Sequence, residues 1–407
     1  MIASPNREDG PPGCGTERAA AWGGAVASQG WSITIFSGSR VWGGAEEQTR
    51  LLATGMQCAG HQCRFVARAG PVVARMREEG FPTLALPGTG RSPLSIWKAR
   101  RHLRATRPDV VHFVDPHAVT CGGLASLGLG IAARVGVRHN PFPLRSPARY
   151  RLLCNRMICV CEVVAEACYR SGLPASMLRV VRNSCVPPSQ PAMDREELRA
   201  SVGLSPEHEV LLTAAQFNEC KGHTYLFQAL PRVLQRHPRV RLILAGTGPR
   251  EEELRRQACE LGISGQVLFL GFRRDVRLWM QAADLLVLPS LTEGMSAVLM
   301  EAMYEGCPIV TTTVGGTMEL LVPHSASDLL AWLIPPARVD LLAEAIIDAL
   351  GDEKQRMERS ARAARRVRRD YTVERMVANT LSVYRELIEG PGACGRLADL
   401  QWSGIPS

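Results

Sequence analysis

The stretch LVLPSLTEGMSAVLMEAMYEGCPIVTTTVGGTME, residues 286–319, decides the fold of this chain. It starts with a short apolar run that ends at Pro289 and continues through a glycine-containing loop into a helical pattern from Ala297 to Glu305. A second apolar run then leads to Gly315 and Gly316. A strand, a helix and a strand in this order predict a βαβ unit with two parallel strands.

The same alternation extends through most of the chain in both directions. Strands are expected at 210–214, 241–245, 266–270 and 285–288 on one side of VPPSQPAMD (186–194), and from 32–36 to 178–181 on the other. Three prolines in that nonapeptide are typical of a linker between domains. We therefore expect an α/β fold of two Rossmann-like, doubly wound domains, residues 31–188 and 189–370, that face a central cleft. Residues 1–30 are expected to form a disordered extension, the helix 371–388 to pack back on the first domain, and 389–407 to form a tail.

The composition agrees with a folded α/β protein. The chain has 407 residues, of which 46% are hydrophobic and 21% charged, and a formal net charge of +9, which favours anionic partners. Its 13 cysteines include no CxxC pair, so we interpret the densest group as core residues and not as metal ligands. That group is Cys154, Cys159, Cys161 and Cys168. Neither a secretory signal nor a membrane-spanning segment is expected, and the location expected is cytoplasmic.

Several loops that follow the predicted strands carry residues suited to a phosphorylated ligand. Lys221 follows the first strand of the second domain, where a bound diphosphate needs a cation. Glu293 and Glu301 are eight residues apart, a span of about 12 Å on a continuous helix at about 1.5 Å per residue, which is unfavourable for a paired acid and base. A loop Glu293 and a helical Glu301 can instead line one elongated ligand, whose hydroxyls would donate to the carboxylates. Glycine turns that suit phosphate binding occur at Gly43-Gly44 and Gly246-Thr247-Gly248.

In combination, these motifs resemble the family 4 glycosyltransferases of the GT-B fold. The motifs that carry the resemblance are KGH (221–223), GTGP (246–249), EGM at the start of E-x7-E (293–301) and VGG-x2-E (314–319). The similarity covers about residues 32–387 and is strongest over 210–320. It implies a nucleotide-sugar donor, UDP- or GDP-linked, bound in the second domain, and an acceptor in the first.

The resemblance also implies a role for individual residues. Catalytic roles fall on Lys221 at the diphosphate, Glu293 at the transferred sugar and the cleft residue His112. Glu301 would bind the ribose, His117 and His139 would lie on the acceptor side, and Glu319 would support the site from behind. The donor-binding set implied is Gly43, Gly44, Gln216, Gly246, Gly248, Phe272, Gly294, Met295, Ser296 and Glu301.

The chain departs from the family pattern at two places. Gln216 stands where the family has an arginine, after Ala215 in place of a glycine, and Val114 stands where a second histidine is usual. Loss of that arginine removes a charge-assisted hydrogen bond worth about 1.5–3 kcal/mol. Two consequences are open: the activity is weakened, or Arg273 or Arg274 supplies the missing positive charge.

The resemblance implies a retaining, metal-independent transfer of a hexose to a glycan, a glycolipid or another cell-surface precursor, with no cofactor. No DxD sequence is present to hold a metal in the manner of the other main transferase fold. The alternatives are a nucleotide-sugar 2-epimerase of the same fold, or a catalytically weak sugar-nucleotide-binding protein.

Two basic stretches suggest partners without deciding them. The helix 96–106, IWKARRHLRAT, is either a solvated helix or a contact with anionic lipid at the inner face of the cytoplasmic membrane. The run RMERSARAARRVRR (356–369) lacks interleaved aromatic residues, so we interpret it as a solvated helix face and expect no nucleic-acid partner.

Overall fold

The computed structural model describes residues 30–88, 90, 92–187, 193–323 and 328–390. The extension expected at 1–30 and the tail expected at 389–407 lie almost entirely outside these residues, as does the middle of the linker.

Within the described residues, the first domain contains a sheet of seven parallel strands in the order β3-β2-β1-β4-β5-β6-β7. The order reverses between β1 and β4, so successive crossover helices cover opposite faces of the sheet. The strands are β1 (Ser32–Ser37), β2 (Gln62–Arg68), β3 (Thr83–Leu86), β4 (Val110–Phe113), β5 (Ala133–Arg138), β6 (Arg156–Cys159) and β7 (Leu178–Val180). The helices are α2 (Gly44–Cys58), α3 (Pro71–Glu78), α4 (Pro93–Thr106), α5 (Pro116–Ser126), α6 (Pro147–Leu153), α7 (Glu162–Arg170) and the 3-10 turn η1 (Ala175–Met177).

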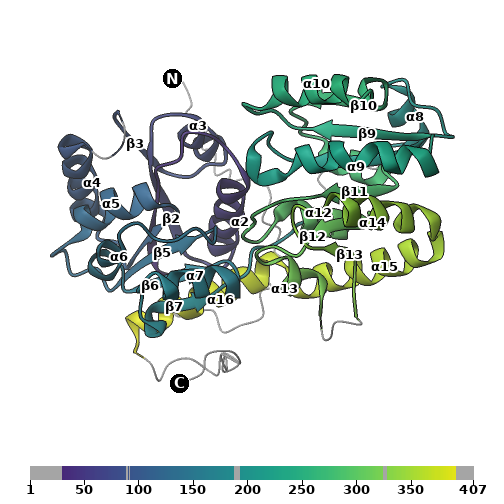
Figure 1. Cartoon of the computed structure of the whole chain (residues 1–407). Helices are drawn as coiled ribbons and strands as arrows, with labels where there is room; N and C mark the ends of the chain where they lie inside the picture. The colour runs from purple at the N-terminus through teal and green to yellow at the C-terminus, as the bar shows by residue number, and fades with distance from the viewer. Residues whose placement is uncertain (1–29, 89, 91, 188–192, 324–327, 391–407) are drawn as a thin grey trace, which may run out of the picture.

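The second domain has a six-stranded parallel sheet in the order β10-β9-β8-β11-β12-β13, the order of a dinucleotide-binding Rossmann fold. Its strands are β8 (Glu209–Ala214), β9 (Val240–Ala245), β10 (Val267–Gly271), β11 (Leu285–Leu288), β12 (Ile309–Thr312) and β13 (Trp332–Ile334). Its helices are α8 (Arg195–Ala200), α9 (His223–Arg236), α10 (Glu251–Glu260), α11 (Val276–Ala282), α12 (Ala297–Glu305), α13 (Thr317–Leu321) and α14 (Val339–Gly351), with 3-10 turns η2 (Glu219–Lys221) and η3 (Ser264–Gln266). The expected fold of two doubly wound α/β domains is confirmed (Figure 1).

The central strands form because they are apolar along their whole length. Every residue of β4 and of β11 is buried, the pattern of a parallel strand covered by helices on both faces. Gly122 of α5 lets that helix approach closely, since a Cβ there would lie 2.6 Å from the ring of Phe113 and 2.8 Å from that of Phe36. Close helix-to-sheet packing of this kind holds the carboxyl ends of the strands in place, where ligands of such folds bind.

The C-terminal helices connect the two domains. Helix α15 (Glu353–Asp370) packs against α12 and α14, and α16 (Val373–Ile388) continues to the first domain, where it contacts α2 and β5 (Figure 1). Glu386 of α16 accepts from Arg156 at 2.7 Å and from Arg179 at 2.6 Å. These half-buried ion pairs fix the last helix to the edge of the first sheet.

The interpretation of the arginine-rich run on α15 as a solvated helix face is wrong for four of its arginines. Its arginines were expected to point into solvent, but four of them donate to backbone carbonyls of other elements. Arg359, for example, bonds the carbonyl of Ala331 at 2.8 Å and lies over the Trp332 ring. The arginines on this helix therefore bind α15 to its own domain; the four are Arg356, Arg359, Arg366 and Arg368.

The four clustered cysteines are core residues, as the sequence predicted. Each is at most 3% exposed, and the sulfurs of Cys159 and Cys168 lie 4.0 Å apart as free thiols. In the part of the chain that the structure describes, no group of three or more His, Cys, Asp or Glu side chains is arranged to hold a metal ion. Nor is any described helix both long and apolar enough to span a membrane.

Candidate active site

The site in the second domain lies where the strand order of its sheet reverses, between β8 and β11. Lys221 ends the short turn η2 that follows β8, and the backbone N–H of Leu291, just after β11, donates to the carbonyl of Cys220 at 2.7 Å. Gly222 is required here, because its φ is +68° and a Cβ would lie 2.0 Å from the carbonyl oxygen of Pro289. The lysine turn is therefore held against the end of the neighbouring strand.

Lys221 and Glu293 form an ion pair at this point. The Nζ atom lies 2.6 Å from Glu293 Oε1, which also accepts from the Ser290 hydroxyl at 2.7 Å. The lysine side chain is 24% exposed and the glutamate 10%, so both reach the cleft while largely shielded from water. Thr312 donates to the carbonyl of Ser290 at 2.5 Å and ties this loop to β12.

The loop that follows Glu293 also forms the wall between the domains. A Cβ on Gly294 would lie 1.8 Å from the carbonyl oxygen of His139 in the first domain. The N–H of Gly316 donates to the carbonyl of Gly294 at 2.7 Å, and the Asn183 amide donates to that of Met295 at 3.3 Å. Ser296 begins α12, but its side chain makes no capping hydrogen bond.

Glu301 lies one turn further along α12 in an acidic setting. Burial, with smaller contributions from Glu47 and Glu305, raises its pKa from 4.5 to about 7, against the opposing effect of Arg277. Arg277 is itself bound to Glu305 at 2.5 Å. A carboxyl with a pKa of about 7 changes its charge near neutral pH.

The remaining donor-side loops are linked by backbone hydrogen bonds. Gly246 N donates to the carbonyl of Gly271 at 2.8 Å, and Phe217 N to that of Thr247 at 3.0 Å. A Cβ on Gly246 would lie 1.9 Å from the carbonyl oxygen of Ala215, and one on Gly248 would lie 2.5 Å from that of Phe217.

Beside these loops, Gln216 is exposed and the Phe272 ring is 72% exposed at the carboxyl end of β10. Of the two arginines considered as replacements for the missing cation, Arg273 pairs with Asp275 at 2.5 Å. Arg274 is exposed and makes no ion pair with any residue that the structure describes.

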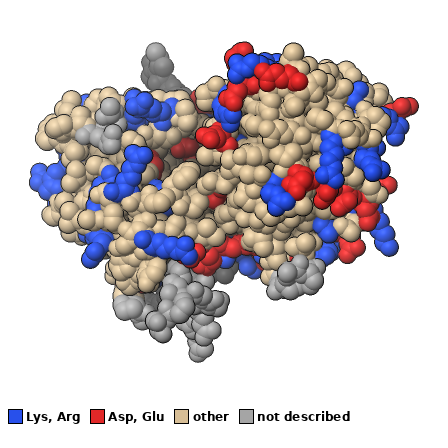
Figure 2. Space-filling view, viewed as in Figure 1, with Lys and Arg blue, Asp and Glu red and all other residues tan. Residues whose placement is uncertain are grey.

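The glycine turn of the first domain faces the start of α12. Gly43 is the N-cap of α2, and a Cβ on Gly44 would lie 4.0 Å from that of Ala297. The two helix N-termini, α2 from one domain and α12 from the other, thus approach one position in the cleft. Partial positive charge at both termini favours an anion there. Figure 2 shows this face of the molecule hollowed between the two domains.

His112 lies inside the first domain and not on the cleft surface. It is 2% exposed, and its Nδ1 shares a hydrogen bond of 2.6 Å with the hydroxyl of Tyr384 on α16. Burial lowers its pKa to about 3, with a smaller contribution from His139. The histidine is therefore neutral at physiological pH.

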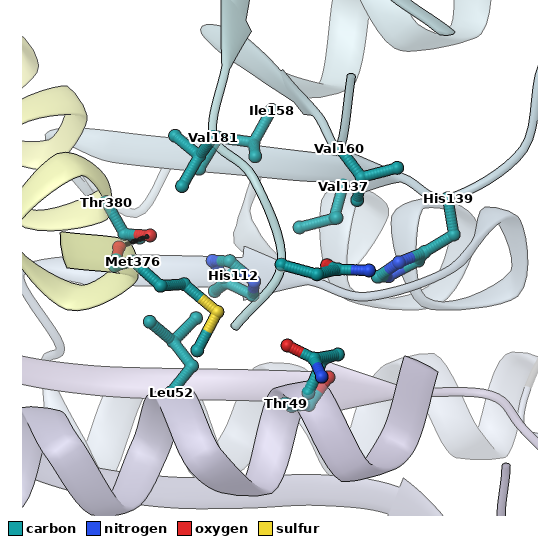
Figure 3. A pocket seen from close by; sticks show the side chains of 12 residues that line it. Thr49, Leu52, His112, Val137, His139, Ile158, Val160, Val181, Met376 and Thr380 are labelled. Atoms are coloured by element: carbon teal, nitrogen blue, oxygen red, sulfur yellow. Dashed lines mark hydrogen bonds between the residues drawn. The ribbon is translucent and has the colours of Figure 1, made fainter. Parts of the chain in front are cut away.

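A cavity of about 30 Å³, enough for a water molecule, is lined by His112 (Figure 3). Met376 and Thr380 of α16 and residues of α2 also line it. His139 lines the same cavity, and its Nε2 has no hydrogen-bond partner among the described residues. Burial lowers the pKa of His139 to about 4. Lys221 and Glu293 do not line this cavity.

Glu319 joins the two domains. It accepts from the backbone N–H of Glu162, at the start of α7, at 2.6 Å and from Arg182 at 3.1 Å. Tyr371 donates to its backbone carbonyl at 3.1 Å. The residue thus holds the interface behind the ligand-facing loop.

A second and larger pocket lies at the reversal point of the first sheet. It has a volume of about 290 Å³ and is lined by Gly38, Ser39, Arg40, Glu46, Arg68, Asp115 and His117. His117 was the one side chain in it expected from the sequence. The position of Arg40 in the glycine-rich turn after β1 could have marked it as a candidate ligand-binding residue. Arg68 ends β2, and nothing in the neighbouring sequence marks it as a binding residue. Ser290 and Tyr384 were likewise not expected.

Two parallel-sheet domains that meet at such a cleft define the GT-B class of glycosyltransferases. Residues 194–366 match the family model of the glycosyl transferases group 1, and residues 42–185 match that of Glycosyltransferase Family 4. The two matches follow one another along the chain and cover both domains, so the chain belongs to these glycosyltransferases.

Its relatives include an uncharacterised glycosyltransferase of Methanocaldococcus jannaschii, 28% identical over 56% of this chain and 58% of the relative. The lipopolysaccharide core mannosyltransferase LpsB of Rhizobium meliloti is 26% identical over 49% of this chain and 58% of LpsB. LpsE of the same organism, a lipopolysaccharide core glycosyltransferase, is 32% identical over 60% and 66%. The match thus spans less than two thirds of these relatives.

Among solved structures, Anabaena HepE in complex with UDP-glucose aligns with a TM-score of 0.75 at 23% identity over 87% of this chain and all of HepE. WaaG, a glycosyltransferase involved in lipopolysaccharide biosynthesis, aligns at 0.66 and 17% identity over 88% of this chain and all of WaaG. These likenesses show the fold.

Proposed function

We propose that this enzyme transfers a hexose or a related sugar from a UDP- or GDP-linked donor to a glycan or lipid-linked acceptor, with retention of anomeric configuration. The observation that carries the proposal is the Lys221–Glu293 ion pair at the reversal point of the second sheet. An ammonium suits a diphosphate and a carboxylate suits sugar hydroxyls, and here they occupy adjacent positions. The UDP-glucose complex of HepE, a protein of the same fold, supports this class of donor.

The arrangement also supports a mechanism without an enzymic nucleophile. Glu293 Oε1 already accepts hydrogen bonds from Lys221 and Ser290, which lowers its ability to attack a sugar carbon. Negative charge that develops on the leaving diphosphate would be stabilised by Lys221 and by the N-terminus of α12, both fixed in place before reaction. The leaving phosphate would take the acceptor proton on the same face of the sugar. Neither a metal nor another cofactor has a step in this route.

A donor panel tests the proposal directly. UDP- and GDP-linked glucose, mannose, galactose and N-acetylglucosamine would be incubated with the full chain, and release of nucleotide and of sugar would be measured. We expect one donor to be hydrolysed or transferred with retention of its α-configuration. Formation of a 2-epimer would support the epimerase alternative.

The exposed Gln216, in the position of the missing arginine, is the observation that favours a catalytically weak binding protein. Nucleotide binding without turnover of any donor in the panel would support that alternative. Absence of nucleotide binding would overturn the proposal.

We further propose a peripheral location on the inner face of the cytoplasmic membrane. On α4, Leu94 is 52% exposed and Trp97 is 55% exposed, with Arg101 stacked over the indole ring. The helix binds the domain through its opposite face, where Ala99 and Leu103 are buried. On the face seen in Figure 2, the first domain carries basic side chains with few acidic ones among them. Sedimentation with phosphatidylglycerol vesicles tests this, and binding that is insensitive to salt and to Trp97→Ala would count against it.

A further inference from the structure

The pocket at the reversal point of the first sheet has no assigned ligand beyond the expectation for His117. Its residues come from the loop after β1, the end of β2 and the loop after β4, so they surround the crevice in which doubly wound sheets bind ligands. A volume of about 290 Å³ is near the lower end of the range for small-molecule sites, about 300–1,000 Å³. This size suits a single sugar unit.

The two carboxylates of the pocket are occupied by the protein itself. Asp115 Oδ2 accepts from Gly38 N at 2.5 Å, and its Oδ1 accepts from the backbone N–H of His117 at 2.7 Å and of Ala118 at 2.9 Å. Asp115 is thus the cap of α5, and its charge is offset by the N-terminus of that helix. Glu46 lies in the first turn of α2, where burial raises its pKa despite hydrogen bonding to Ser39 and the backbone.

The two guanidinium groups of the pocket, in contrast, are uncommitted. Neither Arg40 nor Arg68 has a hydrogen bond or ion pair from its side chain to any residue that the structure describes. Elsewhere on α2, by contrast, Arg50 pairs with both Glu47 and Glu79. Two free guanidinium groups beside one pocket offer planar forks of N–H donors that match a carboxylate or a phosphate.

We propose that this pocket binds a sugar unit that bears a carboxylate or a phosphate, through Arg40 and Arg68, and that this unit belongs to the acceptor. The inference rests on the proposed function, because it names the chemistry of the acceptor in that reaction. The same guanidinium groups could serve the donor diphosphate, so the experiment must separate the two anions. The position of the pocket favours the acceptor, since the diphosphate has Lys221 and the start of α12 at the other reversal point.

Binding of D-glucose 6-phosphate, D-glucuronate, D-glucose and UDP to the full chain, measured by calorimetry or ligand-observed NMR, tests the inference. We expect the two anionic sugars to bind at least tenfold more tightly than D-glucose. In the double variant Arg40→Gln/Arg68→Gln, the affinity for the two anionic sugars should fall to that for D-glucose, a loss that corresponds to one or two charge-assisted hydrogen bonds. The affinity of this variant for UDP should stay within twofold of wild type. Arg236→Gln, an exposed arginine of the second domain, is the matched control and should change neither.

The outcomes separate this inference from the proposed function. Equal binding of glucose and glucose 6-phosphate, or a parallel loss of UDP affinity in the double variant, would overturn the anionic-acceptor assignment while the donor site stands. Absence of UDP binding to the wild-type chain would instead overturn the proposed function. If the double variant does not fold, glucose 6-phosphate is titrated into wild-type enzyme saturated with UDP: simultaneous binding supports the inference, and competition overturns it.

Discussion

Replacement of Lys221 by alanine should reduce sugar transfer by about 10²–10³-fold. Lys221 is the cation at the reversal point of the second sheet, held 2.6 Å from Glu293 by a turn that is bound to β11. Gln216 stands in place of the family's arginine and Arg273 is bound to Asp275, so of the two arginines considered as replacements Arg274 alone is left to share the charge stabilisation with Lys221.

The magnitude comes from two contributions. Loss of one preorganised donor to a developing oxyanion costs about 2.7–4 kcal/mol in the transition state, which gives the 10²–10³-fold decrease in kcat. The ground-state diphosphate loses one charge-assisted hydrogen bond, about 1.5–3 kcal/mol, so the Kd for UDP should rise at least tenfold. Glu293 keeps its hydrogen bond from Ser290, so the fold should survive.

The assay is release of UDP or GDP from the donor identified by the panel, with calorimetry for nucleotide binding and a melting curve for folding. The chain contains three lysines, of which Lys354 lies exposed in the first turn of α15, and Lys354→Ala is therefore a matched control. We expect wild-type turnover from the control. Turnover of the Lys221→Ala enzyme within threefold of wild type would refute the assignment of the diphosphate site.

Three further predictions concern the cleft and its support. Because the pKa of Glu301 is about 7, its carboxyl stabilises the fold most at low pH, and this contribution is lost as pH rises from 4.5 through 7, whereas UDP should bind more tightly above pH 7. In Glu301→Gln, stability and UDP affinity should both lose the part of their pH dependence that Glu301 contributes, and pH profiles unchanged from wild type contradict the prediction. Gly294→Ala should lower Tm and abolish transfer, because a Cβ would overlap the opposing domain, while Gly265→Ala, which has open space around it, should do neither in the same melting and turnover assays. Tyr384→Phe should lower the free energy of unfolding in urea by about 1–3 kcal/mol, since buried His112 loses its hydrogen-bond partner, and a smaller change would show that water replaces the hydroxyl.

The fold could be predicted because its signals are local. Each strand is a short apolar run, each crossover is a helical pattern, and a parallel sheet follows from their alternation. Lys221 and Glu293 were also accessible from the sequence, as residues just after two strands of one sheet. Their direct ion pair was not, because strand order within the sheet determines which loops are neighbours, and that order depends on packing of the whole domain.

Contacts between distant segments had no such signal. Tyr384 meets His112 across 272 positions of sequence, and nothing around either residue marks the partner. The sequence identified α15 as a basic helix but not the carbonyl groups that its arginines meet, since these belong to the ends of other elements. The arginines were therefore assigned to solvent, where an isolated amphipathic helix would place them.

Each of the two reversal points carries cations that contribute to the net charge of +9. A nucleotide diphosphate and an anionic acceptor would repel each other when brought together in the cleft. Transfer between them requires separate cations on the two sides of the bond that is made. Lys221 in one domain and the uncommitted Arg40 and Arg68 in the other provide that arrangement, while Gly44 and Ala297 bring the two sides together at the centre.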